Sequence, residues 1–379
     1  MFDYETLKLI WWVLVGVLLI GFALTDGFDL GAVILMPFVG RTDSERRVVL
    51  NTIGPHWEGN QVWLVTAAGA LFAAWPVVYA ASFSGFYWAM LLVLFALFTR
   101  PLGFDYRSKL DNPTWRERWD WVMWVGSFVP SLVFGVAFGN LFLGVPFILD
   151  ETMRISYTGG FWGLLNPFGI LVGLVSVAML TTHGATWLMM RTDQQVFQRS
   201  RSAVQIFSLA YLVTFIGAGL WLWLGIQGYS VTSLIDGNAA IDPLSKTVAQ
   251  DNPGWLANYS LYPIMRVAPV IGILGGVLAF LAATINRSGL AFLGSALAIT
   301  GTLCTAGFAL FPFLMPSSID LASSLTMWDA VSSHKTLGIM FIAAGIFVPI
   351  ILAYTLWSYI KLWGVIKVAD IESDPRGLY

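Results

Sequence analysis

Residues 59 to 99 carry no Asp, Glu, Lys or Arg side chain, and this uninterrupted stretch restricts the fold more than any other part of the sequence. A bilayer core about 30 Å thick needs roughly 20 apolar residues of helix to cross it. The stretch is too long for one pass, and Trp75-Pro76 followed by Ser84-Gly85 offers a point of reversal. We therefore expect two membrane passes here.

The composition extends this interpretation to the whole chain. Hydrophobic residues make up 57% of the sequence and charged residues only 11%, whereas an ordinary soluble domain carries about 25% charge. A water-facing surface cannot be built from so few polar side chains. Seven further apolar runs predict one pass each: residues 9–36, 121–145, 161–190, 203–227, 265–286, 288–313 and 336–362. The sequence thus predicts an all-α integral membrane protein with nine transmembrane helices.

Lys and Arg residues are unevenly divided between the alternate loops of this arrangement. Fifteen belong to the loops of one side and five to those of the other. Short cytoplasmic loops accumulate positive residues. We therefore expect the amino terminus outside, the carboxyl terminus in the cytoplasm, and the longest loop, about residues 228–263, on the outer face. This assignment requires an odd number of passes.

Charge and cysteine content exclude several classes of function. The net charge is −2 and the cationic residues are scattered along loops, so the chain has no basic face for nucleic acid. Cys304 is the single cysteine, which excludes a disulfide within the chain and a cysteine-based metal cluster. No Rossmann glycine fingerprint, phosphate loop or HExxH motif occurs in a suitable context. We expect neither nucleic acid nor a metal ion to be bound by this chain.

Carboxylates within the predicted passes are the clearest candidates for chemistry, because an ionised acid at bilayer depth is costly and usually faces a partner or a water path. Asp26 and Asp29 share one face of the first helix, toward its cytoplasmic end. Glu58 precedes the second pass at the same boundary, beside His56. Groups of this kind can relay protons. Two plainer interpretations stay open: the aspartates pair with arginines or cap a broken helix, and Glu58 is a helix-start acid favoured by the dipole.

Haem ligation can be weighed against the three histidines of the chain. His56 lies at a membrane boundary, His334 lies at the outer end of the last pass, and His183 alone lies well inside an apolar run, next to Thr181 and Thr182. Membrane haem commonly takes an axial His from within a helix. A single His on such a polar stripe is more often hydrogen-bonded to a neighbour. We therefore do not expect a multi-haem centre in this chain.

Arg100 lies deeper than the other cationic residues, between an apolar helix and Pro101. We expect it to pair with Glu58 or with one of the two aspartates, and the sequence leaves these alternatives open. The cations that follow are expected to be interface anchors that extend toward water: Arg107, Lys109, Arg116 and Arg118.

Several segments resemble the second subunit of cytochrome bd quinol oxidases. The most specific are DGFD at residues 26–29 and HWEGNQVW at residues 56–63. Further matches are FDYE at 2–5, IWW at 10–12, ERR at 45–47, LFAAWP at 71–76, RPLGFDYR at 100–107 and the segment 311–318. The likeness extends from the first residue to Tyr379, and the later helices match mainly in pattern.

The resemblance implies a nine-helix subunit made of two four-helix bundles plus one peripheral helix. Residues 1–145 would form the first bundle, 146–330 the second bundle with the outer loop, and 331–379 the ninth helix with a cytoplasmic tail. It also implies a bacterial inner (plasma) membrane location in contact with lipid, a similarly folded large subunit as partner, and a small single-span accessory subunit.

In that family the large subunit carries haems b and d, oxidises quinol and reduces dioxygen to water, so the resemblance implies that this chain is haem-free. A structural quinone is bound by the second subunit of some members. Protons for water come from the cytoplasm, along a pathway that would run here past Asp26, Asp29 and Glu58; position 58 is Asp in some members. We group with this pathway a supporting polar cluster: His56, Asn60, Gln61, Arg100 and Asp105.

Two other classes of function stay open at this point. A secondary transporter also uses intramembrane carboxylates and helices broken by Gly or Pro. A purely structural subunit would brace the large subunit and use every acid for assembly.

Overall fold

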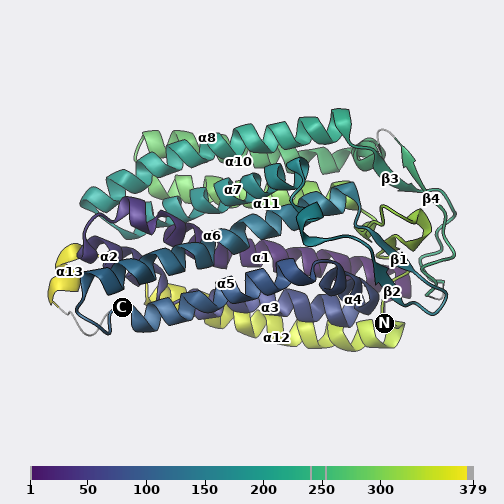
Figure 1. The fold of residues 1–379 in the computed structure, drawn as a ribbon, viewed down its shortest axis with the longest axis horizontal. Helices are drawn as coiled ribbons and strands as arrows, with labels where there is room; N and C mark the ends of the chain where they lie inside the picture. The colour runs from purple at the N-terminus through teal and green to yellow at the C-terminus, as the bar shows by residue number, and fades with distance from the viewer. Residues whose placement is uncertain (1, 240, 252–253, 374–379) are drawn as a thin grey trace.

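The long apolar runs form helices that lie side by side along one axis in the computed structural model, which describes residues 2–239, 241–251 and 254–373 (Figure 1). Within these residues, eight helical segments are long and apolar enough to cross a membrane. They are α1 (Tyr4–Val39), α5 (Tyr87–Tyr106), α6 (Pro113–Leu143), α7 (Pro167–Arg191), α8 (Gln194–Gly225), η3 (Pro263–Arg266) continuing as α10 (Val267–Thr284), α11 (Ser288–Leu310) and α12 (His334–Lys361). The prediction of an all-α integral membrane protein is confirmed.

The remaining predicted pass corresponds to α3 (Trp57–Ala74), which has 18 residues and is not among those eight segments. Its first turn contains Glu58, and Asn60 and Gln61 follow, so polar residues occupy the start of this short helix. It nevertheless lies beside α1. The count of nine therefore stays a prediction.

The predicted reversal after α3 is longer than a simple turn. Trp75 ends α3, and Pro76 occupies the first position of a short helix, α4 (Pro76–Gly85), where its missing N–H costs nothing. Phe86 then joins α4 to α5. The two passes expected in residues 59–99 are thus connected by a helix of ten residues.

Short elements close the two ends of the helical array. At one end lie α2 (Asp43–Ile53) and α13 (Val368–Ser373); at the other lie the antiparallel pairs β1 (Phe147–Leu149) with β2 (Ile155–Tyr157) and β3 (Gly228–Val231) with β4 (Val248–Asp251) (Figure 1). Phe147 is opposite Tyr157, and Gly228 is opposite Asp251. A third pair joins β5 (Phe313–Met315) to β6 (Leu325–Thr326), and further short helices are η1 (Phe161–Leu164), η2 (Gly254–Leu256), α9 (Ala257–Leu261) and η4 (Leu321–Ser323).

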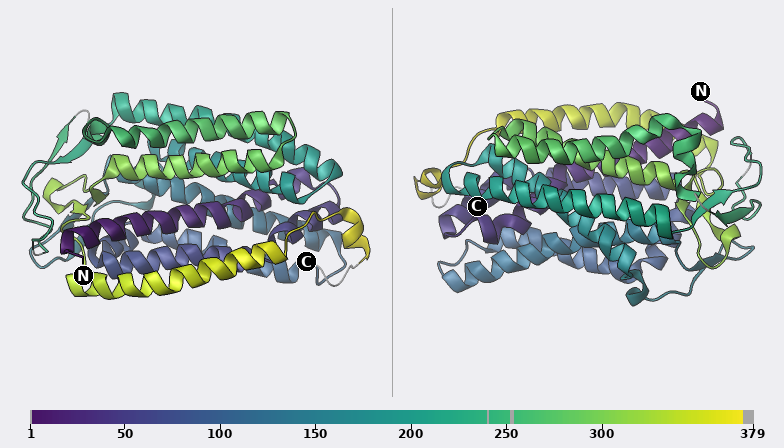
Figure 2. Two further views of the ribbon diagram at one scale, coloured as in Figure 1. Left: turned by 180° about the vertical axis from the view of Figure 1, so that it is seen from behind. Right: turned by 90° about the horizontal axis from the view of Figure 1, so that it is seen from above.

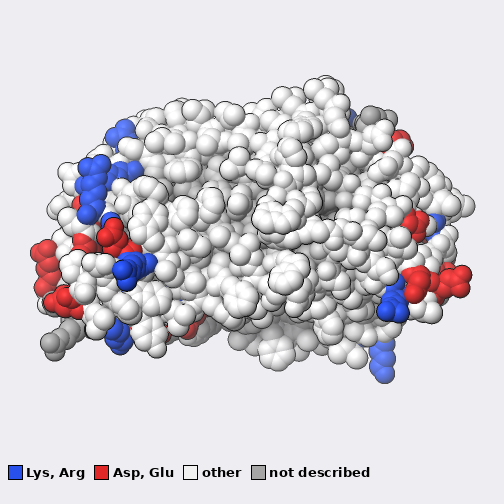
Figure 3. All heavy atoms as spheres, in the orientation of Figure 1, with Lys and Arg blue, Asp and Glu red and all other residues white. Residues whose placement is uncertain are grey.

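Charged side chains gather at the two ends of the molecule and leave a wide uncharged band between them in the view of Figure 3. Large hydrophobic residues are exposed midway along the long helices, including Phe95 of α5 at 62% and Leu274 of α10 at 60%. Such a surface suits lipid, whose hydrocarbon offers no hydrogen-bond partners. The start of α1 lies at the end that carries β1 to β4, and α13 lies at the opposite end (Figure 1).

Close contact between α1 and α7 fixes the helix that carries both aspartates. Gly31 faces the backbone of Leu180 and Gly184, so closely that a Cβ atom at either glycine would clash with the other helix. Small residues at such crossings allow backbones to approach in membranes, where van der Waals contact drives helix association. The face of α1 with Asp26 and Asp29 is thereby held inside the protein.

The predicted division at residue 145 stays a prediction. Both α1 and α6 belong to the first predicted bundle, yet both pack extensively on α7 of the second. The last long helix, α12, lies along α1 and α3 at the edge of the molecule (Figure 2). Its two fully buried residues are Leu337 and Gly338.

Candidate functional site

Asp26 and Arg100 form a buried ion pair inside the protein. Asp26 comes from α1 and Arg100 from α5, and both side chains are 0% exposed. The guanidinium donates to both carboxylate oxygens, over 2.9 Å from Nη1 and 2.7 Å from Nη2. This bidentate geometry is the strongest way for arginine to hold a carboxylate. Of the alternatives that the sequence left open for Arg100, pairing with an aspartate is confirmed and pairing with Glu58 is wrong.

Asp29 lies one turn further along α1 and has a different environment. It is also 0% exposed, but its hydrogen-bond partner is an amide: the Nδ2 of Asn60 donates to its Oδ2 over 2.8 Å. The other oxygen, Oδ1, has no hydrogen-bond partner among the described residues. A buried carboxylate oxygen of this kind needs water or a proton, since leaving it unpaired is costly.

Tyr359 completes this arrangement from the far end of the chain. Its hydroxyl donates to the Oδ1 of Asn60 over 2.6 Å, so that a hydrogen-bonded series joins α12, α3 and α1. Sequence reasoning missed Tyr359. A tyrosine near the end of a predicted pass looks like any interface aromatic, and the sequence holds no signal that separates the two.

His56 and Glu58 lie close in sequence but in different surroundings. The His56 side chain is buried and its ring is stacked on that of Tyr359, with centroids 4.2 Å apart and an interplanar angle of 10°. Glu58 is exposed on the surface of α3, and Gln61 is half-buried. The structure therefore places Asn60 against Asp29 and His56 against Tyr359, and it leaves Glu58 outside that buried group.

Asp105 does not belong to the cluster with Asp26 and Asp29. Its side chain is exposed on α5, whereas Arg107, two residues later, is buried. Arg107 binds Asp120 of α6, which also accepts a 2.8 Å hydrogen bond from Arg46, and it binds Asp43 at 2.9 Å. Asp105 is therefore corrected to a surface position. Arg107 is a buried structural cation, not an interface anchor, because the cap of α2 brings Asp43 beneath it.

The local sequence explains how α2 is placed. Thr42 accepts a hydrogen bond from the backbone of Glu45, and the Glu45 carboxylate accepts one from the backbone of Thr42, which forms a capping box. The same carboxylate binds Arg199 of α8 at 2.8 Å. Glu45 thereby links α2 to α8, close to the end of α1 from which α2 continues.

His183 has the surroundings that the sequence favoured. Its Nδ1 is 2.8 Å from the hydroxyl of Ser295 and its Nε2 is 3.0 Å from the carbonyl of Leu24, so both ring nitrogens are engaged. The ring stacks on Phe292. Axial ligation needs a free nitrogen lone pair facing open space. The geometry at His183 does not fit a haem.

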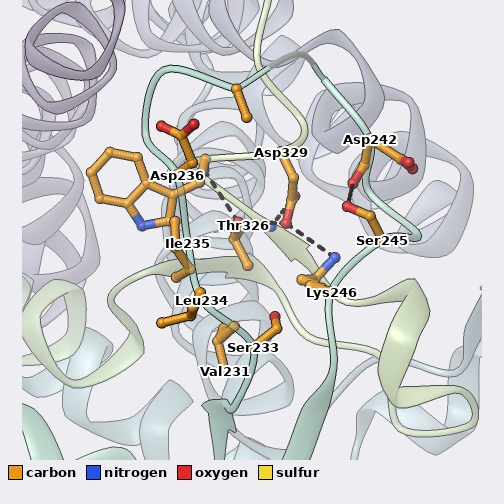
Figure 4. A pocket seen from close by; sticks show the side chains of 12 residues that line it. Val231, Ser233, Leu234, Ile235, Asp236, Asp242, Ser245, Lys246, Thr326 and Asp329 are labelled. Carbon is orange, nitrogen blue, oxygen red and sulfur yellow. Dashed lines mark hydrogen bonds and ion pairs between the residues drawn. The ribbon is translucent and has the colours of Figure 1, made fainter.

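A small pocket of about 160 Å³ lies between the loop that joins β3 to β4 and the segment that follows β6 (Figure 4). Lys246 and Asp329 point toward each other across it, 3.1 Å apart. Burial lowers the pKa of Lys246 against the attraction of Asp329, and burial raises the pKa of Asp329 in spite of Lys246 and Thr326. The pair joins the long loop to the β6 segment, and it is remote from the aspartates of α1.

Comparisons with known proteins cover nearly the whole chain. Residues 7–362 match the family described as cytochrome bd terminal oxidase subunit II. The chain is 54% identical to cytochrome bd-I ubiquinol oxidase subunit 2 of Escherichia coli strain K12 over 379 residues, which is 100% of both chains. It is 52% identical to the probable cytochrome oxidase subunit 2 of Haemophilus influenzae, again over 100% of both.

More distant relatives agree with this. The chain is 32% identical to cytochrome bd ubiquinol oxidase subunit 2 of Bacillus subtilis over 357 residues, which cover 92% of this chain and 94% of that protein. The solved structure of bd oxidase from Geobacillus thermodenitrificans has a chain that matches with a TM-score of 0.67 and 14% identity, over 94% of this chain and 99% of that one. That last likeness concerns the fold alone. On the family match and the full-length relatives together, this chain belongs to the subunit II family of cytochrome bd terminal oxidases.

Proposed function

We propose that this chain takes up protons from the cytoplasm and passes them to the oxygen-reducing partner subunit, with Asp29 as the group that binds the proton. Its family membership makes the chain a subunit of a terminal quinol oxidase of the respiratory chain, in the inner membrane. The observation that carries the proposal is the buried Asp29, whose hydrogen-bond partner among the described residues is an amide and not a cation. An intramembrane acid of this kind marks an ion or proton path.

Asp26 and Asp29 have different roles in this proposal. The bidentate contact with Arg100 neutralises Asp26 and makes it a fixed structural charge. Asp29 is one turn away and keeps one oxygen without a hydrogen-bond partner in the described part of the chain. We infer that Asp26 and Arg100 set the electrostatic field of the pathway and that the proton itself resides on Asp29.

Glu58 would act at the boundary between this chain and its partner. The side chain is exposed, and so are Gly59, Val62 and Val65 on the same helix. An exposed carboxylate beside such an apolar strip is expected to be covered in the assembled complex. Glu58 would then receive the proton at a site formed by both subunits. The same covering would leave the Asp29 environment unchanged.

We also propose cofactors and further partners for the complex. Haems b and d would belong to the large partner subunit; of the three histidines here, His183 has both ring nitrogens engaged by protein groups. A structural quinone, a small single-span accessory subunit and annular lipid are proposed without assigned contacts. The unequal division of Lys and Arg supports an external amino terminus and a cytoplasmic carboxyl terminus.

Full-length similarity to oxidase subunits does not favour the secondary-transporter alternative. The bracing alternative differs from the proposal in one measurable way. If the acids serve assembly alone, isosteric amides that assemble should leave turnover unchanged.

The test is oxygen consumption by the complex purified with Asp29→Asn or Glu58→Gln. Both changes keep size and remove titration, so turnover should fall while the haem absorption spectrum is retained. The matched control is Asp111→Asn, because Asp111 is 99% exposed at its side chain. Normal turnover and normal charge separation in both variants would refute the proton-uptake function.

A further inference from the structure

Tyr359 of α12 makes a hydrogen bond to a buried side chain of α3. Most of α12 is exposed, and the neighbouring Tyr354 is 68% exposed. Tyr359 by contrast is half-buried and its hydroxyl makes the 2.6 Å bond to Asn60. A helix with so few buried residues therefore contributes one specific polar contact to the site.

The orientation of the Asn60 amide follows from this contact. An ionised carboxylate only accepts hydrogen bonds, so Asp29 faces the amide nitrogen, and the Tyr359 hydroxyl, which donates to the amide oxygen, holds the amide in that orientation. The Nδ2 then donates to Oδ2 of Asp29, and Oδ1 is the oxygen left without a hydrogen-bond partner among the described residues. Without the hydroxyl, the amide oxygen loses the contact that holds it away from Asp29.

Packing holds Tyr359 in this position. Its ring is stacked on His56 and meets Phe28 and Trp187 edge-on, at 6.3 and 6.2 Å between centroids. An aromatic ring packed on three sides has little rotational freedom, so the hydroxyl is pre-organised toward Asn60.

The end of α12 is held by a second contact, one turn beyond Tyr359. Arg191 of α7 donates to the carbonyl of Leu362 over 2.9 Å, and its guanidinium lies between the rings of Trp187 and Trp363, at 5.2 and 5.1 Å from the centroids. The backbone of Ile366 donates to the carbonyl of Arg191. These contacts fix the depth at which Tyr359 meets α3.

We propose that Tyr359 is a positioning residue for proton binding at Asp29: its hydroxyl holds the Asn60 amide in place, and the amide binds one carboxylate oxygen and leaves the other to accept the proton. This inference rests on the proposed function, because it assigns a task to Tyr359 only if Asp29 binds the transferred proton. The residue acts through Asn60 and does not itself carry the proton.

Tyr359→Phe tests the proposal, because it removes the hydroxyl and keeps the ring. In the purified complex, kcat for oxygen consumption should fall about tenfold while KM for quinol is unchanged, as expected when one buried hydrogen bond is lost from a group that acts in turnover. The matched control is Tyr354→Phe on the same helix, which should leave both constants unchanged.

Infrared difference spectroscopy measures a property that would not change if Tyr359 had only a structural role. The carboxylic C=O band that disappears in Asp29→Asn should shift in Tyr359→Phe, because the hydrogen bond to Asp29 has changed, and should be unshifted in Tyr354→Phe. Asn60→Ala, which removes both bonds, should slow turnover at least as much as Tyr359→Phe.

The outcomes separate the two proposals. If Asp29→Asn turns over normally, the proton-uptake function itself fails. If Asp29→Asn is slow, but Tyr359→Phe keeps normal turnover and an unshifted band, only the role of Tyr359 fails. Slow turnover in Asn60→Ala with normal turnover in Tyr359→Phe would likewise contradict the positioning role of Tyr359.

Discussion

Arg100 donates hydrogen bonds to both carboxylate oxygens of Asp26, which is 74 residues away in the chain, and both side chains are buried. Removing one partner of a buried ion pair leaves the other charge uncompensated. Asp26→Asn should therefore destabilise the protein by about 3–5 kcal/mol, whereas Asp26→Leu combined with Arg100→Met should recover much of that loss. Thermal unfolding of the purified complex measures both.

Asp111→Asn is the control for this prediction, because the Asp111 side chain is 99% exposed and pairs with Arg116, not with Arg100. It should unfold at the same temperature as the unaltered complex. Equal stability of Asp26→Asn and Asp111→Asn would show that the Asp26–Arg100 pair does not hold α1 to α5.

The sequence was enough to predict the helical membrane fold and to single out Asp26, Asp29 and Arg100, which the structure shows to be buried. A carboxylate within an apolar run stands out by itself, and an arginine at similar depth on a later helix needs an acid as partner. Arg107 was predicted to be an interface anchor because several cations follow Arg100 in the sequence, and this prediction was wrong. Arg107 is buried because Asp43 and Asp120 contact it from two other elements. Such convergence is a tertiary property.

Which way a side chain faces was the least predictable property. Glu58 and Asn60 are two residues apart, about 200° around a helix, so one faces outward and the other faces Asp29. In a soluble helix, polar residues would mark the outer face. In a membrane both faces are apolar, and this signal is lost. Tyr359, 299 residues from Asn60, could not be connected to it without the fold.

Asp120 should be the most sensitive charge in the network that joins α2, α5 and α6. It is 0% exposed and accepts hydrogen bonds from Arg46 and Arg107. Asp120→Asn turns an amide toward these donors and leaves two guanidinium groups poorly paired, which should cost about 3–5 kcal/mol. Urea or thermal unfolding of the complex at two salt concentrations should show a loss that salt does not remove.

Asp111→Asn provides the comparison, because Asp111 pairs with Arg116 at 3.0 Å but its side chain is almost fully exposed. An exposed pair is screened by water and salt and should contribute nothing measurable. Similar losses for both variants would mean that burial does not determine the strength of this network.

The contact between α1 and α7 should be intolerant of a single methyl group. A Cβ at Gly31 would clash with the backbone oxygen of Leu180, and a backbone atom cannot rotate away. Gly31→Ala should separate the helices and cost about 1–3 kcal/mol, the usual range for overpacking. Less assembled complex and a lower unfolding temperature are the expected measurements.

Gly16→Ala on the same helix is the matched substitution, because nothing in the described part of the chain lies within 4 Å of a Cβ at Gly16. Alanine is the better helix former by about 1 kcal/mol, so this variant should be at least as stable as the unaltered protein. If both glycine variants behave alike, close packing at Gly31 does not hold α1 in place.

Lys246 and Asp329 give a prediction that depends on pH. Burial already raises the pKa of Asp329 above its ordinary value of 3.8 in the presence of Lys246, and Lys246→Met removes the cation that opposes this rise. An acid whose pKa is raised in the folded state stabilises the fold when it is protonated. Stability is therefore lost as the pH rises from about 3.8 through the raised pKa.

The measurement is the rate at which a protease of broad specificity cleaves the loop between β3 and β4. The ratio of this rate in Lys246→Met to that in the unaltered complex should be higher at pH 8 than at pH 5. Lys335→Met changes an exposed lysine, so its cleavage rate should equal that of the unaltered complex at both pH values. If the ratio of rates for Lys246→Met does not depend on pH, Asp329 does not titrate in the folded protein.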